Sequence, residues 1–264
     1  MTADALDLRL LVAAAVVREA GQLARDFFLR REQLEIEHKG MQDLVSIADR
    51  QVEEVIRTRL AAAFPGDGIM GEEGETIEPP AGAGSWVIDP IDGTANFLRG
   101  LPYWSVALAY VRDNRTEVGV TYDPMHDELF AAARGRGATR DGRPIRVSGC
   151  SDMSRAIVGS TFTFKMNTDD YAELLRGILG AGADHRRLGS TALMMCHVAD
   201  GRLDGCATLY CNSWDIIGGL LLVQEAGGVA SDFLDGATLA DPNRAFGCTP
   251  ALAETIAGLV GLRA

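Results

Sequence analysis

The sequence has little of several features that would assign it to a special class of protein. Its five cysteines are odd in number and include no C-x-x-C pair, which argues against a disulfide framework or a zinc ribbon. The four histidines form no H-E-x-x-H motif. No uncharged stretch approaches the roughly 18 apolar residues of a membrane span, and no basic segment precedes the N-terminal apolar run. These absences predict a cytoplasmic protein with reduced thiols and no signal peptide or membrane span.

Basic residues are also in the minority. The 25 lysines and arginines stand against 37 aspartates and glutamates, which gives a net charge of −12. Such a chain lacks the broad basic surface that nucleic-acid binding needs, so nucleic acid is not an expected partner. An anionic substrate would have to be received by bound cations or local donors. With 264 residues, the chain is long enough to fold without disulfides or a structural metal.

The order of predicted elements favours a mixed α/β fold. Short apolar segments separated by turns in the first half are typical of an antiparallel meander, and strands and helices alternate in the second half. No linker-like stretch divides the chain, so we expect one domain over residues 1–264, with lobes of about 1–147 and 148–264. The predicted helices span about 6–28, 46–64, 171–179, 190–198, 214–226 and 250–259, and the predicted strands 86–88, 106–111, 117–122, 129–133, 156–162, 203–207, 229–231 and 245–248.

The most informative segment is residues 86–97, which read W-V-I-D-P-I-D-G-T-A-N-F. We expect a buried strand to deliver Asp89 at its carboxyl end, Pro90 to fix a turn, and Asp92 to follow three residues later. Both carboxylates and the Ile91 carbonyl can then converge on one point. Mg²⁺ prefers such an all-oxygen ligand set, so the segment predicts a magnesium site.

The residues after Asp92 suit a phosphate group. Gly93 permits a close backbone approach, and the N–H groups of Gly93 and Thr94 at the start of a predicted helix would cradle phosphate. One alternative is a plain turn in which Asp92 only caps a helix. A phosphatase of the haloacid dehalogenase type also ends its motif in D-G-T, but its nucleophilic aspartate would fall on Pro90, which excludes it.

Two further acidic positions strengthen the metal hypothesis. Glu72, in G-E-E-G, follows a short apolar pair and can leave the end of another strand; the alternative for Glu72 and Glu73 is a solvated acidic loop. Asp215, in N-S-W-D, lies in the first turn of a mostly apolar helix, where it can instead do no more than complement the helix dipole.

Taken together, these motifs resemble those of the inositol monophosphatase family. The resemblance rests on G-E-E, W-V-I-D-P-I-D-G-T-x-N-F, W-D-x-x-G-G and Q-E-A-G-G, with D-L-V-S-x-x-D at 43–49 and L-G-S-T-A at 188–192, and it covers nearly the whole chain. It implies a layered α-β-α-β-α sandwich. It also implies a Mg²⁺-dependent, lithium-sensitive phosphatase, usually a homodimer, in which Mn²⁺ is a possible substitute for Mg²⁺.

The resemblance further implies a ligand set for two to three metal ions. Glu72, Asp89 and the Ile91 carbonyl would hold the first ion. Asp89, Asp92 and Asp215 would hold the second, and Glu72 would also contact a weaker third ion. Attack on phosphorus by a metal-activated water needs no covalent intermediate.

Catalytic and substrate-binding roles are implied in the same way. Glu72 and Thr94 would orient the attacking water, with Asp49 accepting a hydrogen bond from Thr94. Ser190 has a simpler alternative role as a helix cap. The residues implied to contact the substrate are Asp92, Gly93, Thr94, Gly189, Ser190, Thr191 and Thr208.

The sequence departs from the family at the position that bears on substrate choice. Thr208 stands where animal members carry a glutamate that accepts inositol hydroxyls, which predicts that selectivity for inositol is not strict. Thr208 either bonds a hydroxyl or only fills a strand. Lys39 lies on a segment that resembles a mobile loop over the metals, or is simply solvent-exposed. Arg186 and Arg187 either reach a ligand anion or pair with surface acids.

The sequence therefore predicts a Mg²⁺-dependent phosphomonoesterase for a small sugar or polyol phosphate such as inositol-1-phosphate. One alternative is a histidinol-phosphate phosphatase on the same fold. An alternative of another class is a non-catalytic regulatory or binding protein, which degenerate metal ligands would favour. The proposed ligands and the water-orienting threonine are all present: Glu72, Asp89, Asp92, Thr94 and Asp215.

Overall fold

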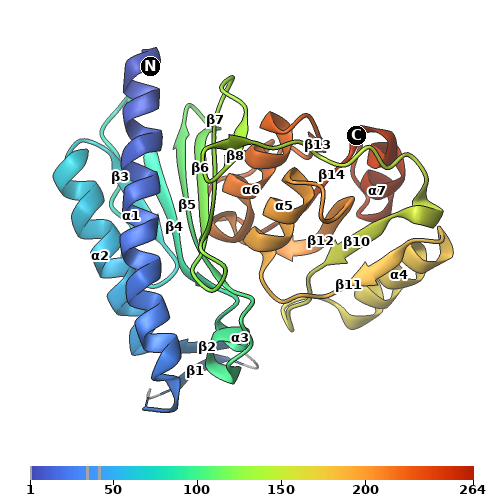
Figure 1. Ribbon diagram of the computed structural model, residues 1–264, viewed down its shortest axis with the longest axis horizontal. Helices are drawn as coiled ribbons and strands as arrows, with labels where there is room; N and C mark the ends of the chain where they lie inside the picture. Colours follow the sequence, from blue (N-terminus) through green and yellow to red (C-terminus); the bar gives the residue numbers. More distant parts are fainter. Residues whose placement is uncertain (1, 34–35, 41–42) are drawn as a thin grey trace.

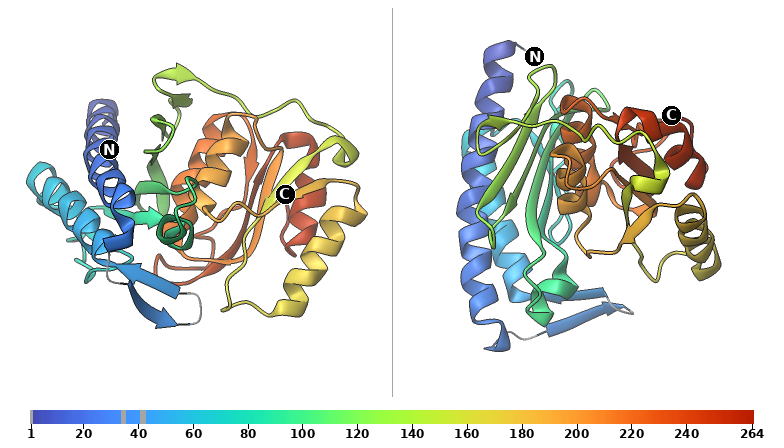
Figure 2. Two further views of the ribbon diagram at one scale, coloured as in Figure 1. Left: turned by 60° about the horizontal axis from the view of Figure 1, so that its bottom comes forward. Right: turned by 45° about the vertical axis from the view of Figure 1, so that its right-hand side comes forward.

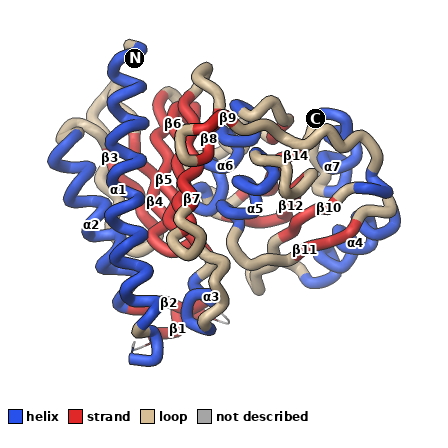
Figure 3. The backbone as a smooth tube through the Cα atoms, in the orientation of Figure 1, coloured by secondary structure: helices blue, strands red, loops and turns tan. Residues whose placement is uncertain are grey.

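The computed structural model describes residues 2–33, 36–40 and 43–264, and its elements form five layers (Figures 1 and 3). Two helices cover one face of a seven-stranded sheet, two more lie between this sheet and a five-stranded sheet, and two cover the far face of the second sheet. This is the expected α-β-α-β-α sandwich. The helices of the three layers are, in that order, α1 (Ala3–Leu29) and α2 (Ile47–Ala63), α5 (Thr191–Ala199) and α6 (Ser213–Glu225), and α4 (Thr168–Gly180) and α7 (Ala253–Leu259).

The first sheet has the strand order β3-β4-β5-β6-β7-β8-β9. β3 runs parallel to β4, and the other neighbouring pairs are antiparallel. β5, β6 and β7 form the predicted meander, and Asp113 and Asn114 make its first turn with positive φ angles of 51° and 56°. The strands are β3 (Gly68–Gly71), β4 (Ser85–Asp92), β5 (Ser105–Arg112), β6 (Arg115–Asp123), β7 (Glu128–Ala133), β8 (Ala138–Arg140) and β9 (Arg143–Pro144).

The second sheet has the order β11-β10-β12-β14-β13. β11, β10 and β12 are parallel, so their carboxyl ends lie at one edge of the sheet, and β14 runs antiparallel to β12. The strands are β10 (Ile157–Ser160), β11 (Asp184–Arg186), β12 (Gly205–Cys211), β13 (Val229–Ala230) and β14 (Asn243–Cys248).

A separate two-stranded hairpin, β1 (Ile36–Gly40) and β2 (Asp43–Ser46), lies beside the short helix α3 (Thr94–Arg99) (Figure 2). Both are at the end of the molecule where β4 ends. The side chain of Lys39, on the predicted mobile segment, lies outside the described part of the chain, as do Met41 and Gln42. Among the described helices, none is long and apolar enough to cross a membrane.

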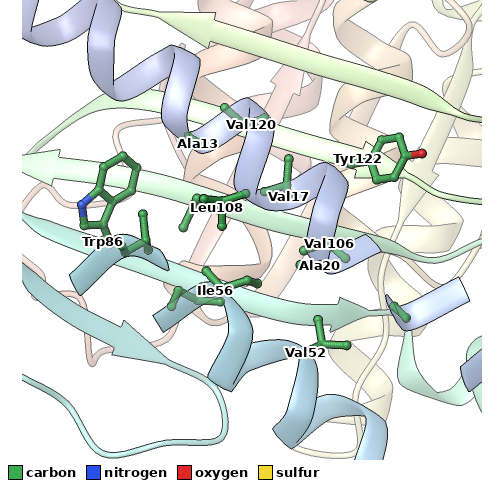
Figure 4. Packing of buried hydrophobic residues seen from close by; sticks show 14 of the residues in the cluster. Ala13, Val17, Ala20, Val52, Ile56, Trp86, Val106, Leu108, Val120 and Tyr122 are labelled. Carbon is green, nitrogen blue, oxygen red and sulfur yellow. The ribbon is translucent and has the colours of Figure 1, made fainter. Parts of the chain in front are cut away.

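The first core lies between the helices α1 and α2 and the seven-stranded sheet. The capping box that begins α2 is confirmed: the Ser46 N–H donates to Asp49 at 2.8 Å, and the Ala48 N–H donates to the Ser46 hydroxyl at 3.2 Å. Gly21 lets α1 approach the sheet closely, because a Cβ there would lie 2.4 Å from the Tyr122 ring. Figure 4 shows the apolar residues of this core, among them Ala13, Val17, Ala20, Val52, Ile56, Trp86, Val106, Leu108, Val120 and Tyr122.

The second core lies around α5 and α6. These two helices are buried on nearly all sides because a sheet covers each of them from both directions, which accounts for their apolar sequences. Gly119 on β6 allows α6 to lie against the sheet, since a Cβ there would be 2.4 Å from the Gly218 carbonyl oxygen. This contact brings the N-terminus of α6 toward the end of β4.

Three element predictions need correction. β4 does not end at residue 88 but continues through Asp92, because a bulge keeps it paired with β5. The last predicted helix divides into a 3₁₀ turn, Pro250–Leu252, and α7. The short strands β1, β2, β8, β9 and β11 were not predicted, since each is too brief for a period-two pattern.

Candidate metal and phosphate site

A bulge in β4 places Asp89 and Asp92 at the site. Asp89 pairs with Ala107 and Asp92 with Ser105, so three steps along β4 match two along β5. Pro90 occupies the bulge, where a missing N–H costs no ladder hydrogen bond. The Ile91 N–H donates to Asp89 Oδ1 at 3.1 Å. The bulge, rather than the predicted turn after the strand, therefore brings both carboxylates to one end of β4.

The loop after β3 adds Glu72 beside them. β3 is parallel to β4 with Gly71 opposite Ile88, and the Glu72 N–H donates to the Ile88 carbonyl at 3.3 Å. Glu72 and Asp89 each follow a residue of the Gly71–Ile88 pair, so they are neighbours on adjacent chain segments. The prediction that Glu72 leaves the end of a strand is confirmed.

A residue that the sequence analysis missed holds this loop. Glu53 on α2 is buried, and its carboxylate accepts hydrogen bonds from the N–H groups of Glu73 at 2.8 Å and Gly74 at 2.9 Å. Arg57, one turn later, donates to the same carboxylate at 2.6 Å. A Cβ at Gly71 would lie 2.1 Å from Glu53 Oε1, so glycine is needed there. The feature of the sequence that could have indicated this role is the position of Glu53 beside the apolar face of α2.

Asp215 approaches from the opposite side, in the first turn of α6. Its carboxylate accepts the Asn212 N–H at 2.9 Å and so closes a capping box. Asp215 therefore caps its own helix, and the charge of Asp92 also acts on it, so the capping role is confirmed and the metal-binding role stays a prediction.

The acids of the site oppose one another's ionisation. Burial raises the pKa of Asp89 well above its usual range, and the neighbouring charges of Glu72, Asp92 and Asp215 raise it further. Burial is also the main reason that the pKa of Asp215 rises to about 7, and the charge of Asp92 is the second cause of this rise. The pKa of Asp49 rises to about 6, again mainly through burial. A set of buried acids that oppose one another's ionisation is an environment in which a cation is stabilising.

Asp92 also joins the first sheet to helix α5. Its carboxylate accepts hydrogen bonds from the N–H groups of Thr191 at 3.1 Å and Ala192 at 2.7 Å and from the Ser190 hydroxyl, all at the N-terminus of α5. Burial raises the pKa of Asp92 to about 6, and these hydrogen bonds oppose the rise. The α5 dipole adds to the stabilisation of the anion.

Asn96 and Gly93 also hold the end of β4 against the segment that leads into α5. Asn96, whose role the sequence did not reveal, donates to the Tyr103 carbonyl at 2.7 Å and to the Leu188 carbonyl at 2.8 Å. Gly93 has a φ of 96°, and a Cβ there would lie 3.0 Å from the Gly189 carbonyl oxygen. The structure thus brings together the predicted segments around Asp92 and Ser190, although they are 98 residues apart.

Thr94 makes the contact that the sequence analysis expected. Its hydroxyl lies 3.3 Å from Asp49 Oδ1 and 3.0 Å from the Ile91 carbonyl oxygen, to either of which it can donate. Asp49 is buried and is held in turn by the N–H and hydroxyl of Ser46. The Thr94 proton is directed toward these acceptors, which leaves its oxygen able to accept a hydrogen bond.

Two of the predicted substrate contacts need correction. Ser190 is completely buried; its hydroxyl donates to Asp92 and accepts the Leu193 N–H at 3.3 Å, so it caps α5 and positions Asp92. Thr208 is 0% exposed, and its hydroxyl accepts a bond from Thr161 at 2.5 Å and donates to the Tyr210 carbonyl at 2.9 Å. With their hydroxyls already engaged and shielded from solvent, neither residue presents a group to a ligand.

Arginines 186 and 187 have different surroundings. Arg186 pairs with Asp184 at 2.7 Å, which is the surface pairing that the sequence left open. Arg187 is exposed and donates to the Phe162 carbonyl at 3.5 Å. Arg187 therefore lies against the loop that follows β10.

The open cavities lie away from these acids. Two adjoining cavities of about 350 and 260 Å³ share Asp113 and Arg134. They are beside the β5–β6 turn, at the opposite end of β5 from Ser105, which pairs with Asp92. Neither of these two cavities is lined by the acids of the site.

The donor set fits a hard divalent cation. Carboxylate oxygens and a backbone carbonyl are the groups that Mg²⁺ prefers, and the mutual repulsion at Asp89 is what a cation would relieve. Within the described ranges, no three His, Cys, Asp or Glu side chains are close enough to hold an ion in the arrangement shown. Asp92 and Asp215 are each turned toward helix N–H groups, so binding would require these carboxylates to reorient.

Comparison with known proteins identifies the class of protein. The model of the inositol monophosphatase family matches residues 6–261, and the chain therefore belongs to the inositol monophosphatase family. This confirms the resemblance drawn from the motifs. It also supports a phosphatase as the general class of activity.

Individual relatives carry two kinds of name. The chain is 40% identical over 229 residues to Nus factor SuhB of Pseudomonas aeruginosa, with 84% of each chain covered. It is 39% identical over 224 residues to an inositol-1-monophosphatase of Rhizobium meliloti, again with 84% of each covered. Among solved structures, the Thermotoga maritima IMPase matches with a TM-score of 0.83 and 31% identity over 96% of each chain.

Proposed function

We propose that the protein is a Mg²⁺-dependent phosphomonoesterase that hydrolyses a small sugar or polyol phosphate. The observation that carries this proposal is Asp89, which is 1% exposed and faces the charges of Glu72, Asp92 and Asp215. Asp89 and Asp92 are buried and Glu72 and Asp215 are half-buried, and gathering these charges is unfavourable unless a cation compensates them. Membership in the inositol monophosphatase family and the relative named inositol-1-monophosphatase support the choice of reaction.

The chain supplies the ligands as follows. Glu72, Asp89 and the Ile91 carbonyl would hold one cation; Asp89, Asp92 and Asp215 a second; and Glu72 a weaker third. Such cations, when bound, acidify a water molecule and neutralise charge on the phosphoryl oxygens. Asp89 is shared by the two main sites, and its burial and the Ile91 N–H bond fix its position.

The protein's own groups orient the attacking water. The Thr94 hydroxyl donates to the Ile91 carbonyl or to Asp49, so its oxygen is left to accept a hydrogen bond from the attacking water. The Glu72 carboxylate, on the loop that Glu53 holds, accepts the second hydrogen bond from this water. The N–H groups of Gly93 and Thr94 receive phosphoryl oxygens, and this positioning supplies the remaining stabilisation.

The substrate class is less restricted than inositol phosphate alone. Thr208 replaces the expected glutamate and is withdrawn from the site, so no carboxylate at that position accepts substrate hydroxyls. Histidinol phosphate is an alternative substrate on the same fold. We also propose that residues 1–264 act as one catalytic unit, that two copies associate as a homodimer, and that the protein is cytoplasmic.

A second candidate function is a binding role in a larger assembly. The P. aeruginosa relative is named a Nus factor, a name that does not describe a phosphatase. The intact set of acids and the net charge of −12 favour catalysis over contact with RNA. An inactive but folded Asp89→Asn variant would separate the two roles, because a partner-binding role does not depend on that carboxylate.

The test is phosphate release from inositol-1-phosphate, histidinol phosphate, fructose-1,6-bisphosphate and phosphoadenosine phosphate, with Mg²⁺ and with EDTA. We expect turnover of at least one compound with Mg²⁺ and none with EDTA. Release at equal rates under both conditions, or no release from any compound, would contradict the proposal.

A further inference from the structure

The side chain of Ser105 carries a buried hydroxyl without a hydrogen-bond partner. Ser105 is 0% exposed, and its Oγ bonds no group within the described part of the chain. Buried polar groups in folded proteins are nearly always hydrogen-bonded, because an unpaired group loses the bonds that it made to water. A buried donor of this kind suggests a partner that it meets in another state of the molecule.

The register of the first sheet places this hydroxyl beside Asp92. Ser105 on β5 lies directly opposite Asp92 on β4. The next residue of β5, Val106, packs in the core beneath α1 and α2, so Ser105 points to the other face of the sheet, toward α5. Asp92 points to the same face, since its carboxylate bonds the N-terminus of α5. Opposite residues have Cβ atoms about 5 Å apart, which is within reach of a side-chain hydrogen bond.

Asp92 does not use the Ser105 hydroxyl in the arrangement shown. Its Oδ1 accepts the Thr191 N–H at 3.1 Å, and its Oδ2 accepts the Ala192 N–H at 2.7 Å and the Ser190 hydroxyl. To give an oxygen to a cation, the carboxylate has to turn away from some of these donors. A turned carboxylate loses part of its support, and a donor near its new position would restore it.

Two other hydroxyls near the site are already committed. The Thr94 hydroxyl is directed to acceptors at the end of β4 and on α2. The Ser190 hydroxyl belongs to the orientation of Asp92 that faces α5, because it also caps that helix. Ser105, by contrast, has its proton free and faces the carboxylate from the neighbouring strand.

We propose that Ser105 is a positioning residue, whose hydroxyl donates a hydrogen bond to Asp92 in the orientation of this carboxylate that binds a divalent cation. The inference rests on the proposed function and adds a residue to its metal site. One oxygen of Asp92 would then face the cation while Ser105 holds the other. Groups that orient a metal-binding carboxylate in this way typically change the affinity for the metal about tenfold to hundredfold when they are removed.

Ser105→Ala tests the proposal in the full-length protein. In EDTA, the variant should have a Tm equal to or above that of the wild type, because an unpaired buried hydroxyl is removed. In a calorimetric titration with Mg²⁺ at pH 7.5, the dissociation constant of one bound ion should rise about tenfold to hundredfold. The two results have opposite signs, and a purely structural role for the hydroxyl would not produce them together.

Thr121→Val is the matched control. Thr121 is also buried, and its hydroxyl also lacks a partner among the described residues, but the residue opposite it on β5 is Ala107, whose side chain offers no acceptor. This variant should bind Mg²⁺ as the wild type does. Ser105→Cys keeps a weaker donor of similar size, so its affinity for Mg²⁺ should lie between those of the wild type and Ser105→Ala.

Three results would overturn the role of Ser105 alone. The first is an affinity of Ser105→Ala for Mg²⁺ equal to that of the wild type, and the second is an equal loss of affinity in Thr121→Val. The third is a Tm of Ser105→Ala in EDTA clearly below the wild-type value, which would show that the hydroxyl is already paired in the metal-free protein. A wild type that binds no Mg²⁺ would instead overturn the proposed function and this inference together.

Discussion

Glu53 holds the loop that carries Glu72, and its replacement by alanine should affect both stability and activity. The carboxylate is 2% exposed and accepts hydrogen bonds from Glu73, Gly74 and Arg57. Removing one partner of such a buried charged pair costs about 3–5 kcal/mol. At about 2–4 °C per kcal/mol for a chain of this size, Tm should fall by about 6–20 °C.

Thermal unfolding and kcat at 25 °C measure the two effects. Glu53→Gln keeps one acceptor oxygen and should lose about 1–3 kcal/mol, an intermediate effect. Glu54→Gln is the matched control, because Glu54 is the exposed neighbour on the same helix. The reasoning fails if the free energy of unfolding of Glu53→Ala lies within about 1 kcal/mol of the wild-type value and the variant retains the wild-type kcat. Glu53 would then not position the loop.

Three further predictions follow from the site. Thr94→Ala should lower kcat by about a hundredfold or more with a smaller change in KM, because water orientation matters most in the transition state; steady-state kinetics in which only KM changes would refute this role. Asp92, Asp215 and Asp89 have folded-state pKa values raised above the unfolded value of about 3.8, so the stability associated with their protonated forms is lost as pH rises. For Asp92 and Asp215 this loss is complete above about pH 6 and 7. The gain in Tm from Mg²⁺ over EDTA should therefore be larger at pH 7.5 than at pH 5, and an equal gain at both would contradict it. Thr208→Glu should lower Tm instead of improving turnover of inositol-1-phosphate, because it buries a carboxylate with no partner; a wild-type Tm would show that the side chain reaches solvent.

The parts of the fold that could be predicted from the sequence are those specified by local patterns. The capping box of Ser46 and Asp49 involves residues three apart, and the helical periodicity of residues 6–28 is continuous. The acids of the site could be identified because each lies in a motif next to a predicted strand or helix end. Their chemistry follows from residue type, which the sequence states directly.

What could not be predicted depends on contacts between distant segments. The bulge in β4 exists because of its pairing with β5, and a strand pattern alone does not show register. The bond between Ser190 and Asp92 joins residues 98 apart, and Glu53 meets Glu73 and Gly74 across 20 and 21 residues. Thr208 was misassigned because burial of its hydroxyl depends on Thr161, 47 residues earlier. Side-chain partners of this kind become visible only in the folded chain.

The central claim, that the buried acids form a divalent cation site, is tested most directly by calorimetric titration of Mg²⁺ into the metal-free wild type and the Asp89→Asn variant at pH 7.5. Asp89 is shared between the two main proposed sites, and burial together with its acidic neighbours raises its pKa well above the usual range. The account predicts that the wild type binds more than one Mg²⁺ per chain and that folded Asp89→Asn loses most of this binding. Equal binding by both proteins, or no binding by the wild type, would contradict it.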